Sequence, residues 1–598
     1  MQEYTSPGEI EVAGDENLTD ALWTAVAQKP DRPALAHRVG DRFVEWTLQQ
    51  FVDEVRAVAK GLMAIGIEKD DKVAVHSSTR LEWTVLDFAI WAAGGVTVPI
   101  YETSSAEQIE WIVTDASVKA IVQENAELTA LFDERKDQMP GCEHRFVIED
   151  GGIEELKQQG ASISDDDVDA RARSVDGSDV ATIVYTSGTT GRPKGCVITH
   201  YNFIWDAEQV QEAAKEFFSE GKRTLLFLPL AHIFARVIQT TCVRAGVMLG
   251  FSTGIPQLVE ELGIFKPDFL LAVPRVFEKV YNGARQKAHD DGKGAIFDKA
   301  ARVAEDYSRQ QEAGKIGIGT KVQHAIFDKL VYGKLRAAMG GNVEYAVSGG
   351  AALGERLGHF FNGIGVTILE GYGLTETTAG AAIGRPSANR IGTVGKPVPG
   401  ASARIADDGE VLLKGGHVFQ GYYNNPEATA EVLDDDGWYH TGDLGQLDGE
   451  GFLRITGRKK ELIVTAGGKN VAPTVLEDRM RAHPLISQAM VVGDNQPFIA
   501  ALVTIDPEAF PAWAEANDKA GKSVADLVDD EDLQAAVQEA VDDANQAVSK
   551  AEAVRAFRIL PVDFEVGDEL SQKMSVKRHV VGEKFQSVID EIYQDVNR

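Results

Sequence analysis

Residues 186–195 read Thr-Ser-Gly-Thr-Thr-Gly-Arg-Pro-Lys-Gly and directly follow the apolar, β-branched run 180–185. Such a run is typical of a buried strand. The polar turn after it holds three glycines, four hydroxyl side chains and Lys194. Glycine lets the backbone approach a ligand closely, and successive backbone N–H groups in a turn form a concave anion site. Because hydroxyls and lysine also suit phosphate oxygens, the stretch predicts a strand followed by a polyphosphate-binding loop.

The spacing within this loop differs from the common phosphate-binding motif G-x-x-x-x-G-K-[ST]. Only two residues separate Gly188 from Gly191, Pro193 precedes the lysine, and Gly195 replaces the final hydroxyl residue. The alternative interpretation is a flexible surface hairpin with a chance lysine. An ordinary turn needs a single glycine, however, so the pattern favours phosphate binding.

Length and composition limit the class of protein. The chain has 598 residues, 44% of them hydrophobic, which is enough for several lobes. It holds no apolar run of about 18 residues, so we expect no membrane span, and residues 1–5 lack the features of a signal peptide. Three scattered cysteines are too few for a disulfide framework or a zinc site, which favours a cytoplasmic location. They are Cys142, Cys196 and Cys242.

The net charge of −32 makes nucleic acid an improbable partner. One short segment is nevertheless basic, opposed there only by Glu461. Its cations are Arg454, Arg458, Lys459, Lys460 and Lys469. The segment is either a solvated basic surface or the place where an anionic substrate binds.

Hydrophobic patterns alternate between helix and strand in the first half of the chain. Helical patterns at 51–65 and 81–93 are each followed by strand patterns, at 73–75 and 96–100. This alternation predicts an α/β fold with a parallel sheet covered by helices. Ligands of such sheets bind beyond the carboxyl ends of the strands, which is where the 186–195 loop falls.

The rest of the chain shows three further patterns. Residues 160–178 are polar and Asp-rich and are predicted to form a linker. Residues 277–341 are charged and helical in pattern, as in an inserted helical segment. Short strands spaced by turns follow from Glu410, and a mixed helix and strand pattern follows Lys460.

A second glycine-rich turn, Glu-Gly-Tyr-Gly-Leu-Thr-Glu-Thr at 370–377, follows the short apolar run 366–369. Its glycines allow flat contact with a base, and Tyr372 offers a stacking surface. Glu376 supplies a hard oxygen ligand, and nucleotide-bound Mg²⁺ needs only one or two protein ligands. The alternative is an ordinary strand–turn–helix connection.

Three more segments carry candidate chemistry. In 439–444 (Tyr-His-Thr-Gly-Asp-Leu), Asp443 can accept hydrogen bonds from both ribose hydroxyls, or else cap a turn. The glycine-started, charged segment 457–463 has the character of a hinge. His232 lies in the apolar segment 229–236, where a lone histidine is more often a core residue.

Together these segments resemble the adenylate-forming superfamily of acyl-CoA synthetases, peptide-synthetase adenylation domains and firefly-type luciferases. The resemblance runs from about residue 20 to the end, with the motifs in family order. Segments 229–236, 273–279 and 348–351, with the helical insert, resemble the long-chain fatty acid–CoA ligase branch.

The resemblance implies a large N-terminal adenylation domain at 1–457 and a small, mobile α+β C-terminal domain at 458–598. The large domain is expected to hold αβαβα-type sheets, the helical insert at about 277–341 and a β-rich lobe at about 390–457. The implied reaction converts a long-chain fatty acid, ATP and coenzyme A into acyl-AMP and then acyl-CoA, with release of pyrophosphate and AMP. Magnesium is the implied metal.

Site residues follow from the resemblance position by position. The β- and γ-phosphates of ATP would be held by Thr186, Ser187, Gly188, Thr189, Thr190, Gly191 and Lys194. Adenine and the rest of the nucleotide would contact Gly349, Gly350, Ala351, Glu370, Gly371, Tyr372, Gly373, Thr375, Asp443 and Arg458. Thr186 and Glu376 would meet Mg²⁺, and Lys460 would be the hinge. His232 would lie near the acyl chain, and Gly467, Gly468 and Lys469 would approach coenzyme A.

A fatty carboxylate is already ionised at neutral pH, so the implied chemistry needs no general base. The obstacle is bringing one anion to the α-phosphate of another, so positioning and charge neutralisation should dominate. Family members carry a C-terminal lysine for this purpose, but here Ser575 occupies its place. Either Lys573 or Lys577 substitutes, or adenylation depends on the large domain alone.

Other readings stay open. Gly-Phe-Ser-Thr-Gly at 250–254 matches the serine hydrolase pattern G-x-S-x-G around Ser252. An enzyme that stops at acyl-AMP or loads a carrier protein, and a non-catalytic nucleotide-binding protein, are further alternatives. Either a monomer or a homodimer is expected. Peripheral contact with the inner face of a membrane suits so apolar a substrate, although we recognise no basic amphipathic helix in the sequence.

Overall fold

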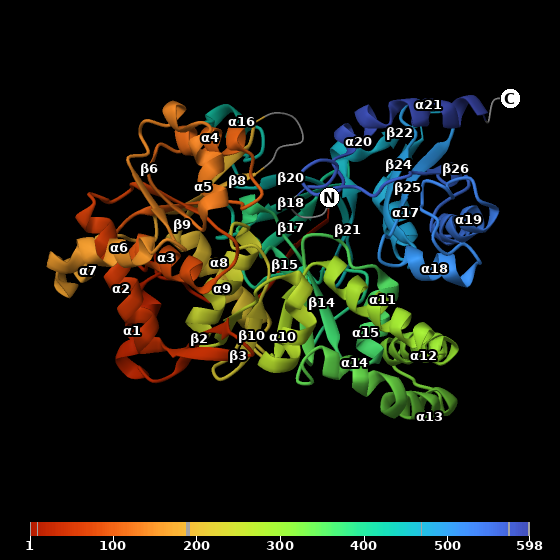
Figure 1. The fold of residues 1–598 in the computed structure, drawn as a ribbon, viewed down its shortest axis with the longest axis horizontal. Coiled ribbons are helices and arrows are strands. Elements are labelled where there is room, and N and C mark those ends of the chain that lie inside the picture. The colour runs from red at the N-terminus through yellow and green to blue at the C-terminus, as the bar shows by residue number, and fades with distance from the viewer. Residues whose placement is uncertain (1, 9, 187–191, 468, 572–574, 596–598) are drawn as a thin grey trace.

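The computed structural model describes residues 2–8, 10–186, 192–467, 469–571 and 575–595. Within them, no helix is both long enough and apolar enough to cross a membrane. The large domain occupies most of the molecule, and the C-terminal segments from β22 to α21 form a separate body at one end (Figure 1).

The first sheet of the large domain has the strand order β19-β9-β8-β5-β4-β6-β7. Neighbouring pairs from β8 through β5, β4 and β6 to β7 are parallel, as the alternating patterns predict. β9 runs antiparallel to β8, and β19 antiparallel to β9. The strands are β4 Lys72–His76, β5 Val96–Ile100, β6 Val118–Gln123, β7 His144–Val147, β8 Val180–Thr186, β9 Lys194–Thr199 and β19 Gly421–Tyr422.

The second sheet has the order β16-β15-β14-β13-β12-β10-β11-β2-β3. Its centre, from β14 to β2, is parallel, and antiparallel strands close both edges. The strands are β2 Pro33–Val39, β3 Arg42–Thr47, β10 Arg223–Leu226, β11 Met248–Phe251, β12 Phe269–Ala272, β13 Tyr345–Ser348, β14 Thr367–Tyr372, β15 Ala382–Ile383 and β16 Lys396–Pro397.

Helices between the two sheets join them into one core. α3 (Leu81–Ala92) contacts β4 and β5 of the first sheet and β2 of the second, and nearly every residue in it is buried. α9 (Ile233–Ala245) is buried to a similar degree. Arg236 of α9, fully buried, forms an ion pair of 2.5 Å with Asp87 of α3 and donates to Thr182 Oγ1 of β8. This α/β arrangement confirms the predicted fold class.

Further helices complete the large domain around the two sheets. Residues 160–178 are not simply a linker, since they include α7, whose N-terminus is closed by a capping box between Ser164 and Asp167. Val168 and Ala172 of α7 are buried, which fixes the helix against the domain. The helices are α1 Asp20–Gln28, α2 Leu48–Ala64, α4 Ala106–Asp115, α5 Ala126–Asp133, α6 Gly152–Gln159, α7 Asp165–Ala172, α8 His200–Ala213, α10 Leu258–Phe265 and α16 Pro426–Ala430.

The predicted helical segment after residue 277 is helical in the structure. It comprises α11 Pro274–Asp290, α12 Gly294–Glu312, α13 Ile318–Phe327, the π-helix η4 Asp328–Tyr332 and α14 Gly333–Ala338. α12 packs against α15 (Glu355–Gly363), the helix that precedes β14. α13 lies at the outer edge of the molecule (Figure 1).

A third, five-stranded sheet forms the β-rich part of the large domain, in the order β1-β17-β18-β20-β21. All neighbouring strands in it are antiparallel. Its edge strand comes from the start of the chain, a pairing that the sequence did not predict. The strands are β1 Gln2–Thr5, β17 Ser402–Ile405, β18 Glu410–Lys414, β20 Tyr439–Leu447 and β21 Leu453–Arg458.

The C-terminal segments have two hydrophobic clusters of their own, distinct from the core of the large domain. One cluster holds side chains of α17, α18 and α19, and the other holds side chains of α20 and α21. The elements are the β22–β23 hairpin Ile463–Val464 and Asn470–Val471, the sheet β24 Ile486–Val492, β25 Ile499–Ile505 and β26 Val554–Ile559, and the helices α17 Pro473–Arg481, α18 Phe510–Ala516, α19 Glu531–Asn545, α20 Arg578–Lys584 and α21 Gln586–Asp595. The domain boundaries at 457 and 458 stay a prediction.

Polar contacts join the two parts beyond their covalent connection. Arg275 at the start of α11 forms an ion pair of 3.0 Å with Asp506, and Lys279 one turn later contacts Glu508 at 3.2 Å. Arg356 of α15 donates to the carbonyl of Ala482 at 3.0 Å. The helical segment and α15 therefore form the wall against which the C-terminal part rests.

Candidate active site

The predicted phosphate loop connects two paired strands of the first sheet. β8 and β9 are antiparallel with Thr186 opposite Lys194, so both residues stand at the base of the loop. Residues 187–191, which include Ser187, Gly188, Thr189, Thr190 and Gly191, lie outside the described residues. Trp111 of α4 anchors the return of the loop, since its ring nitrogen donates to the Pro193 carbonyl at 2.9 Å.

A cavity of about 3470 Å³ lies between the large domain and the C-terminal part. Its lining includes Thr186 and Lys194, residues 349–351 and 370–376, and Asp443 with Arg458–Lys460. Candidate residues from widely separated motifs therefore share one space. α17 and Lys577 belong to the opposite wall.

Two parallel strands bring the adenine candidates together. β13 and β14 pair with Ser348 opposite Glu370, so Gly349, Gly350 and Ala351 emerge beside the end of β14. A Cβ at Gly349 would lie 3.3 Å from the ring of Phe234, which keeps this position small. The Glu370 carboxylate accepts from the Leu353 amide at 3.1 Å.

Burial raises the pKa of Glu370 to about 7, so this carboxyl is largely neutral below neutral pH. When the pKa of a carboxyl is higher in the folded state than in the unfolded state, the free energy of unfolding falls as the pH rises from the unfolded-state pKa to the folded-state pKa. For Glu370 that window runs from the ordinary value of 4.5 to about 7.

Replacing Glu370 with glutamine should remove this pH dependence while keeping an acceptor for the Leu353 amide. The unsubstituted protein should lose stability between pH 5 and pH 8 because Glu370 ionises, whereas E370Q should not. The difference in free energy of unfolding, E370Q minus the unsubstituted protein, should therefore increase by about 1–3 kcal/mol over this range. Urea unfolding at both pH values measures it. Parallel pH profiles of the two proteins would contradict the assignment.

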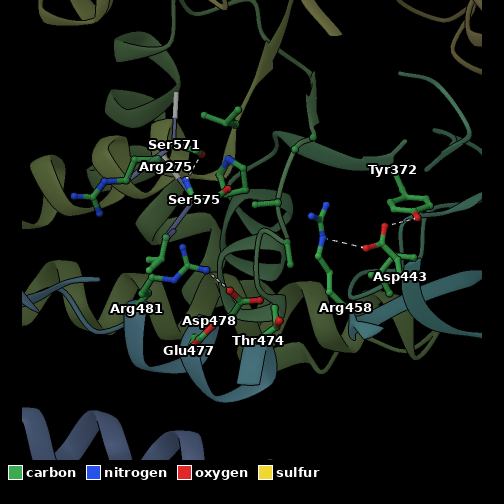
Figure 2. A pocket seen from close by; sticks show the side chains of 18 of the residues that line it. Arg275, Tyr372, Asp443, Arg458, Thr474, Glu477, Asp478, Arg481, Ser571 and Ser575 are labelled. Carbon is green, nitrogen blue, oxygen red and sulfur yellow. Dashed lines mark hydrogen bonds and ion pairs between the residues drawn. The ribbon is translucent and has the colours of Figure 1, made fainter. Parts of the chain in front are cut away.

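Asp443 contacts two side chains that line the cavity, Tyr372 and Arg458 (Figure 2). The Tyr372 hydroxyl donates to its Oδ2 at 2.6 Å, and Arg458 Nε contacts its Oδ1 at 3.1 Å. Pairing of β20 with β21 places Asp443 opposite Arg458. Burial raises the pKa of Asp443, while Arg458 and the Tyr372 hydrogen bond oppose this. The Tyr372 ring is thereby fixed through its hydroxyl.

Glu376 lies in the 3-10 turn η5 (Thr375–Thr377) and is held by a residue that the sequence did not single out. The Tyr422 hydroxyl of β19 donates to Glu376 Oε1 at 2.9 Å. Lys194 Nζ lies 4.9 Å from the centre of the same tyrosine ring. Tyr422 therefore links the lysine of the phosphate loop to the candidate metal ligand.

The backbone turn directly after η5 is strained, and hydrogen bonds to distant residues hold it in place. Thr378 and Ala379 have φ values of 48° and 78°, which non-glycine residues seldom adopt. The Gly380 amide donates to Asp206 of α8 at 3.2 Å, and the Thr378 hydroxyl donates to the His417 carbonyl at 2.8 Å. Burial raises the pKa of Asp206 well above its ordinary value, so this carboxyl is neutral more readily than an exposed one. Asp206 is a positioning residue for the Glu376 turn.

The basic segment after residue 453 is not a free cationic surface. Arg454 contacts Glu355, Lys459 contacts Asp408 and Glu410, and Lys469 contacts Glu552. These acids come from distant parts of the sequence, which explains why local counting overestimated the positive charge. The predicted hinge residue Lys460 lies in the short turn η6 (Lys459–Glu461), between β21 and β22.

His232 caps the N-terminus of α9, since its Nδ1 accepts from the Phe234 amide at 3.1 Å. Its ring therefore has a fixed orientation at the wall of the cavity. Apolar residues from the same region line that wall, including Phe227, Leu228, Ile233, Val237 and Ile238. This surface suits an acyl chain better than a polar substrate.

Family models match nearly all of the chain. The model of AMP-binding enzymes matches residues 22–423, and the model of their C-terminal domain matches residues 460–597. The chain belongs to the AMP-binding enzyme family. The resemblance stated from the motifs is therefore confirmed.

Relatives within the family match over most or all of their length. Long-chain-fatty-acid–CoA ligase FadD15 of Mycobacterium tuberculosis is 49% identical, over 99% of this chain and 100% of that protein. Long-chain-fatty-acid–CoA ligase ACSBG2 of Xenopus laevis is 32% identical, over 94% of this chain and 82% of that protein.

Solved structures of family members share the fold. ATP-bound MatB from Rhodopseudomonas palustris has a TM-score of 0.70 at 23% identity, covering 96% of this chain and 99% of that one. A fatty acyl CoA synthetase of Mycobacterium tuberculosis has a TM-score of 0.63 at 21% identity, covering the same shares.

The family's C-terminal lysine has two candidate replacements here, and the structure describes one of them. Lys573 lies outside the described residues. Lys577 Nζ donates to the Gly567 carbonyl at 2.9 Å, and the Ser571 amide donates to the Ser575 carbonyl at 2.8 Å. Of the predicted coenzyme A residues, Gly467 is exposed and Gly468 lies outside the described residues.

The serine hydrolase interpretation of 250–254 is wrong for this family. Ser252 follows β11, but its hydroxyl donates to the buried carboxylate of Glu261 at 2.5 Å, and Thr253 binds the same carboxylate. A serine nucleophile needs a base that is itself oriented for proton transfer, usually histidine. The Ser-Thr-Glu contact instead closes the turn before α10.

Proposed function

We propose that this protein is an ATP-dependent long-chain fatty acid–CoA ligase that forms acyl-AMP and then acyl-CoA. The full-length identity of 49% to FadD15 of Mycobacterium tuberculosis carries this assignment. The gathering of the nucleotide candidates and an apolar wall in one cavity agrees with it.

Magnesium fits the donors present, and we propose Thr186 and Glu376 as its protein ligands. A hydroxyl and a carboxylate are hard oxygen donors, and Mg²⁺ usually keeps several waters and substrate phosphates in its shell. Among the described residues, no group of three or more His, Cys, Asp or Glu side chains is placed to hold a metal ion. When bound, the ion would neutralise phosphate charge.

In the proposed first step, an oxygen of the fatty carboxylate bonds to the α-phosphorus of ATP, and the bond to pyrophosphate breaks. Lys194 and the 186–191 segment hold the β- and γ-phosphates, so the departing pyrophosphate keeps its counter-charge. Asp443 accepts from the ribose hydroxyls, with Arg458 and Tyr372 fixing its carboxylate. Residues 349–351 and 370–373 surround adenine.

In the proposed second step, the thiolate sulfur of coenzyme A bonds to the acyl carbon and AMP leaves. Rotation of the C-terminal part about Lys460 would bring residues 467–469 to coenzyme A. The ion pair between Lys469 and Glu552 would then open, since the lysine is needed for a phosphate. A cytoplasmic location and the oligomeric state remain predictions.

An enzyme that stops at acyl-AMP is the alternative that Ser575 supports. To distinguish this alternative from the ligase, the purified protein is incubated with ATP, Mg²⁺, coenzyme A and a panel of fatty acids. The products are then identified by mass spectrometry. Acyl-CoA together with AMP is expected. Acyl-AMP that persists when coenzyme A is present would overturn the ligase assignment.

Lysine substitution tests which residue replaces the family lysine. We expect either Lys573→Ala or Lys577→Ala to slow acyl-AMP formation by about 10²-fold, because one cation at the transferring phosphate is lost. Rapid-quench measurement of acyl-AMP reports this step alone. Lys550→Ala, which removes an exposed cation elsewhere in the C-terminal part, is the matched control and should be neutral. Near-normal rates in both variants would show that adenylation depends on the large domain alone.

A further inference from the structure

The outer face of α13 and η4 carries an exposed apolar stripe. Ile318, Val322, Ile326 and Leu330 are 83%, 56%, 51% and 54% exposed. They recur every fourth residue, so the three on α13 share one face of the helix, and Leu330 extends the row into η4. Among the described residues, no other helix or strand carries as many exposed large apolar side chains.

Contacts on the opposite face fix this orientation. The His324 ring stacks on Tyr307 of α12 at 3.9 Å, and its Nε2 contacts the Gly363 carbonyl at 2.6 Å. Phe327 and Tyr332 are buried against the core. The stripe therefore cannot turn inward without breaking the packing of α13 on α12.

Positive charge surrounds the stripe. Residues 315–336 hold five lysine or arginine residues and one acid, Asp328, whose ion pair is with Arg336. The four lysines are exposed, and no ion pair found in the described parts of the chain involves them. They are Lys315, Lys321, Lys329 and Lys334. The whole chain has a net charge of −32, so the charge of this segment is opposite in sign to that of the protein.

We propose that α13 and η4 form a membrane-binding surface that docks on a bilayer containing anionic lipids. Exposed apolar side chains flanked by lysines are the features of helices that lie in the bilayer interface, with the apolar face among the acyl chains and the lysines at the headgroups.

Two observations favour a bilayer over a second copy of the chain. A two-fold contact through this face would bring both lysine sets together and cost Coulomb energy, whereas anionic headgroups attract them. The surface also lies one helix away from the cavity, because α13 packs on α12, and Ala301 and Arg302 of α12 line that cavity. Docking would thus bring the catalytic space close to the membrane, where fatty acids partition.

Vesicle co-sedimentation of the full-length protein, without ATP or coenzyme A, tests the proposal separately from ligase activity. The vesicles are phosphatidylcholine alone, or phosphatidylcholine with about one-third phosphatidylglycerol. We expect binding to the anionic vesicles that weakens with added salt. Failure of the unsubstituted protein to bind the anionic vesicles would overturn the proposal.

Two sets of variants locate the surface. Serine at all four stripe positions (Ile318, Val322, Ile326 and Leu330) should weaken binding at least about tenfold, and K321E with K329E should do the same. Serine at Val39 of β2 and at Val562, which follows β26, is the matched control, since both are exposed apolar residues away from the stripe, and it should leave binding unchanged.

Circular dichroism and turnover of a detergent-dispersed fatty acid establish that the variants fold. Because the lysine variant alters only exposed side chains, it keeps the test decisive if the serine variant unfolds. Unchanged binding in both variants would overturn the proposal. Sedimentation velocity provides a second check. A dimeric unsubstituted protein and a monomeric serine variant would also overturn the proposal, since the stripe would then be a self-association interface.

Discussion

Replacing Glu376 with glutamine is expected to slow acyl-AMP formation by about 10²–10³-fold. The change removes one negative charge from the proposed Mg²⁺ ligand but keeps its size and its contact with the Tyr422 hydroxyl, 2.9 Å away. Hard cations prefer a charged carboxylate to a neutral amide oxygen. Single-turnover formation of acyl-AMP measures the step, and raising the Mg²⁺ concentration should restore part of the rate.

Two companion variants separate this role from a local structural one. Tyr422→Phe leaves the charge in place but removes the hydrogen bond that orients it, so a smaller loss of about tenfold is expected. Glu427→Gln removes an exposed charge at the start of α16 and should have no effect. A rate for E376Q within threefold of the unsubstituted protein would exclude Glu376 as the metal ligand, where the expected loss is about 10²-fold or more.

Replacing Asp443 with alanine is expected to raise the KM for ATP by about 10²-fold. Two charge-assisted hydrogen bonds to ribose would be lost, together worth about 3 kcal/mol. The same change leaves the buried hydroxyl of Tyr372 and the guanidinium of Arg458 without their shared partner. Steady-state kinetics over a range of ATP concentrations measures the effect.

Gln446→Ala is the matched control for Asp443, since Gln446 is an exposed residue on the same strand, β20. Its KM for ATP should equal that of the unsubstituted protein. Thermal melting of both variants detects any loss of folded protein. If D443A changes kcat while the KM for ATP stays constant, Asp443 does not bind the ribose.

Sequence predicted those parts of the fold and site that depend on local chemistry. The strands before residues 186 and 370 follow from apolar, β-branched runs, and the glycine-rich turns after them mark where backbone meets ligand. Parallel pairing of β13 with β14 then places Gly349 beside Glu370. The alternating pattern predicts a parallel sheet, but it does not say which strands are neighbours.

Contacts between distant segments could not be predicted in this way. Tyr422 lies 46 residues from Glu376, and Asp206 lies 174 residues from Gly380, so no local spacing links either pair. The acidic run at 165–167 indicated a linker by composition, although Ser164 and Asp167 already form a capping box for α7. For α13, the pattern shows an apolar face but not that the tertiary packing leaves it outside.

The pairing of β1 with β17 has a consequence for how the chain is synthesised. Tyr4 lies opposite Ala403, so the first strand meets its partner only after about 400 further residues have been made. At roughly 5–20 residues per second, that interval is about 20–80 s. The third sheet is therefore completed late, and β1 stays without this partner until β17 has been made.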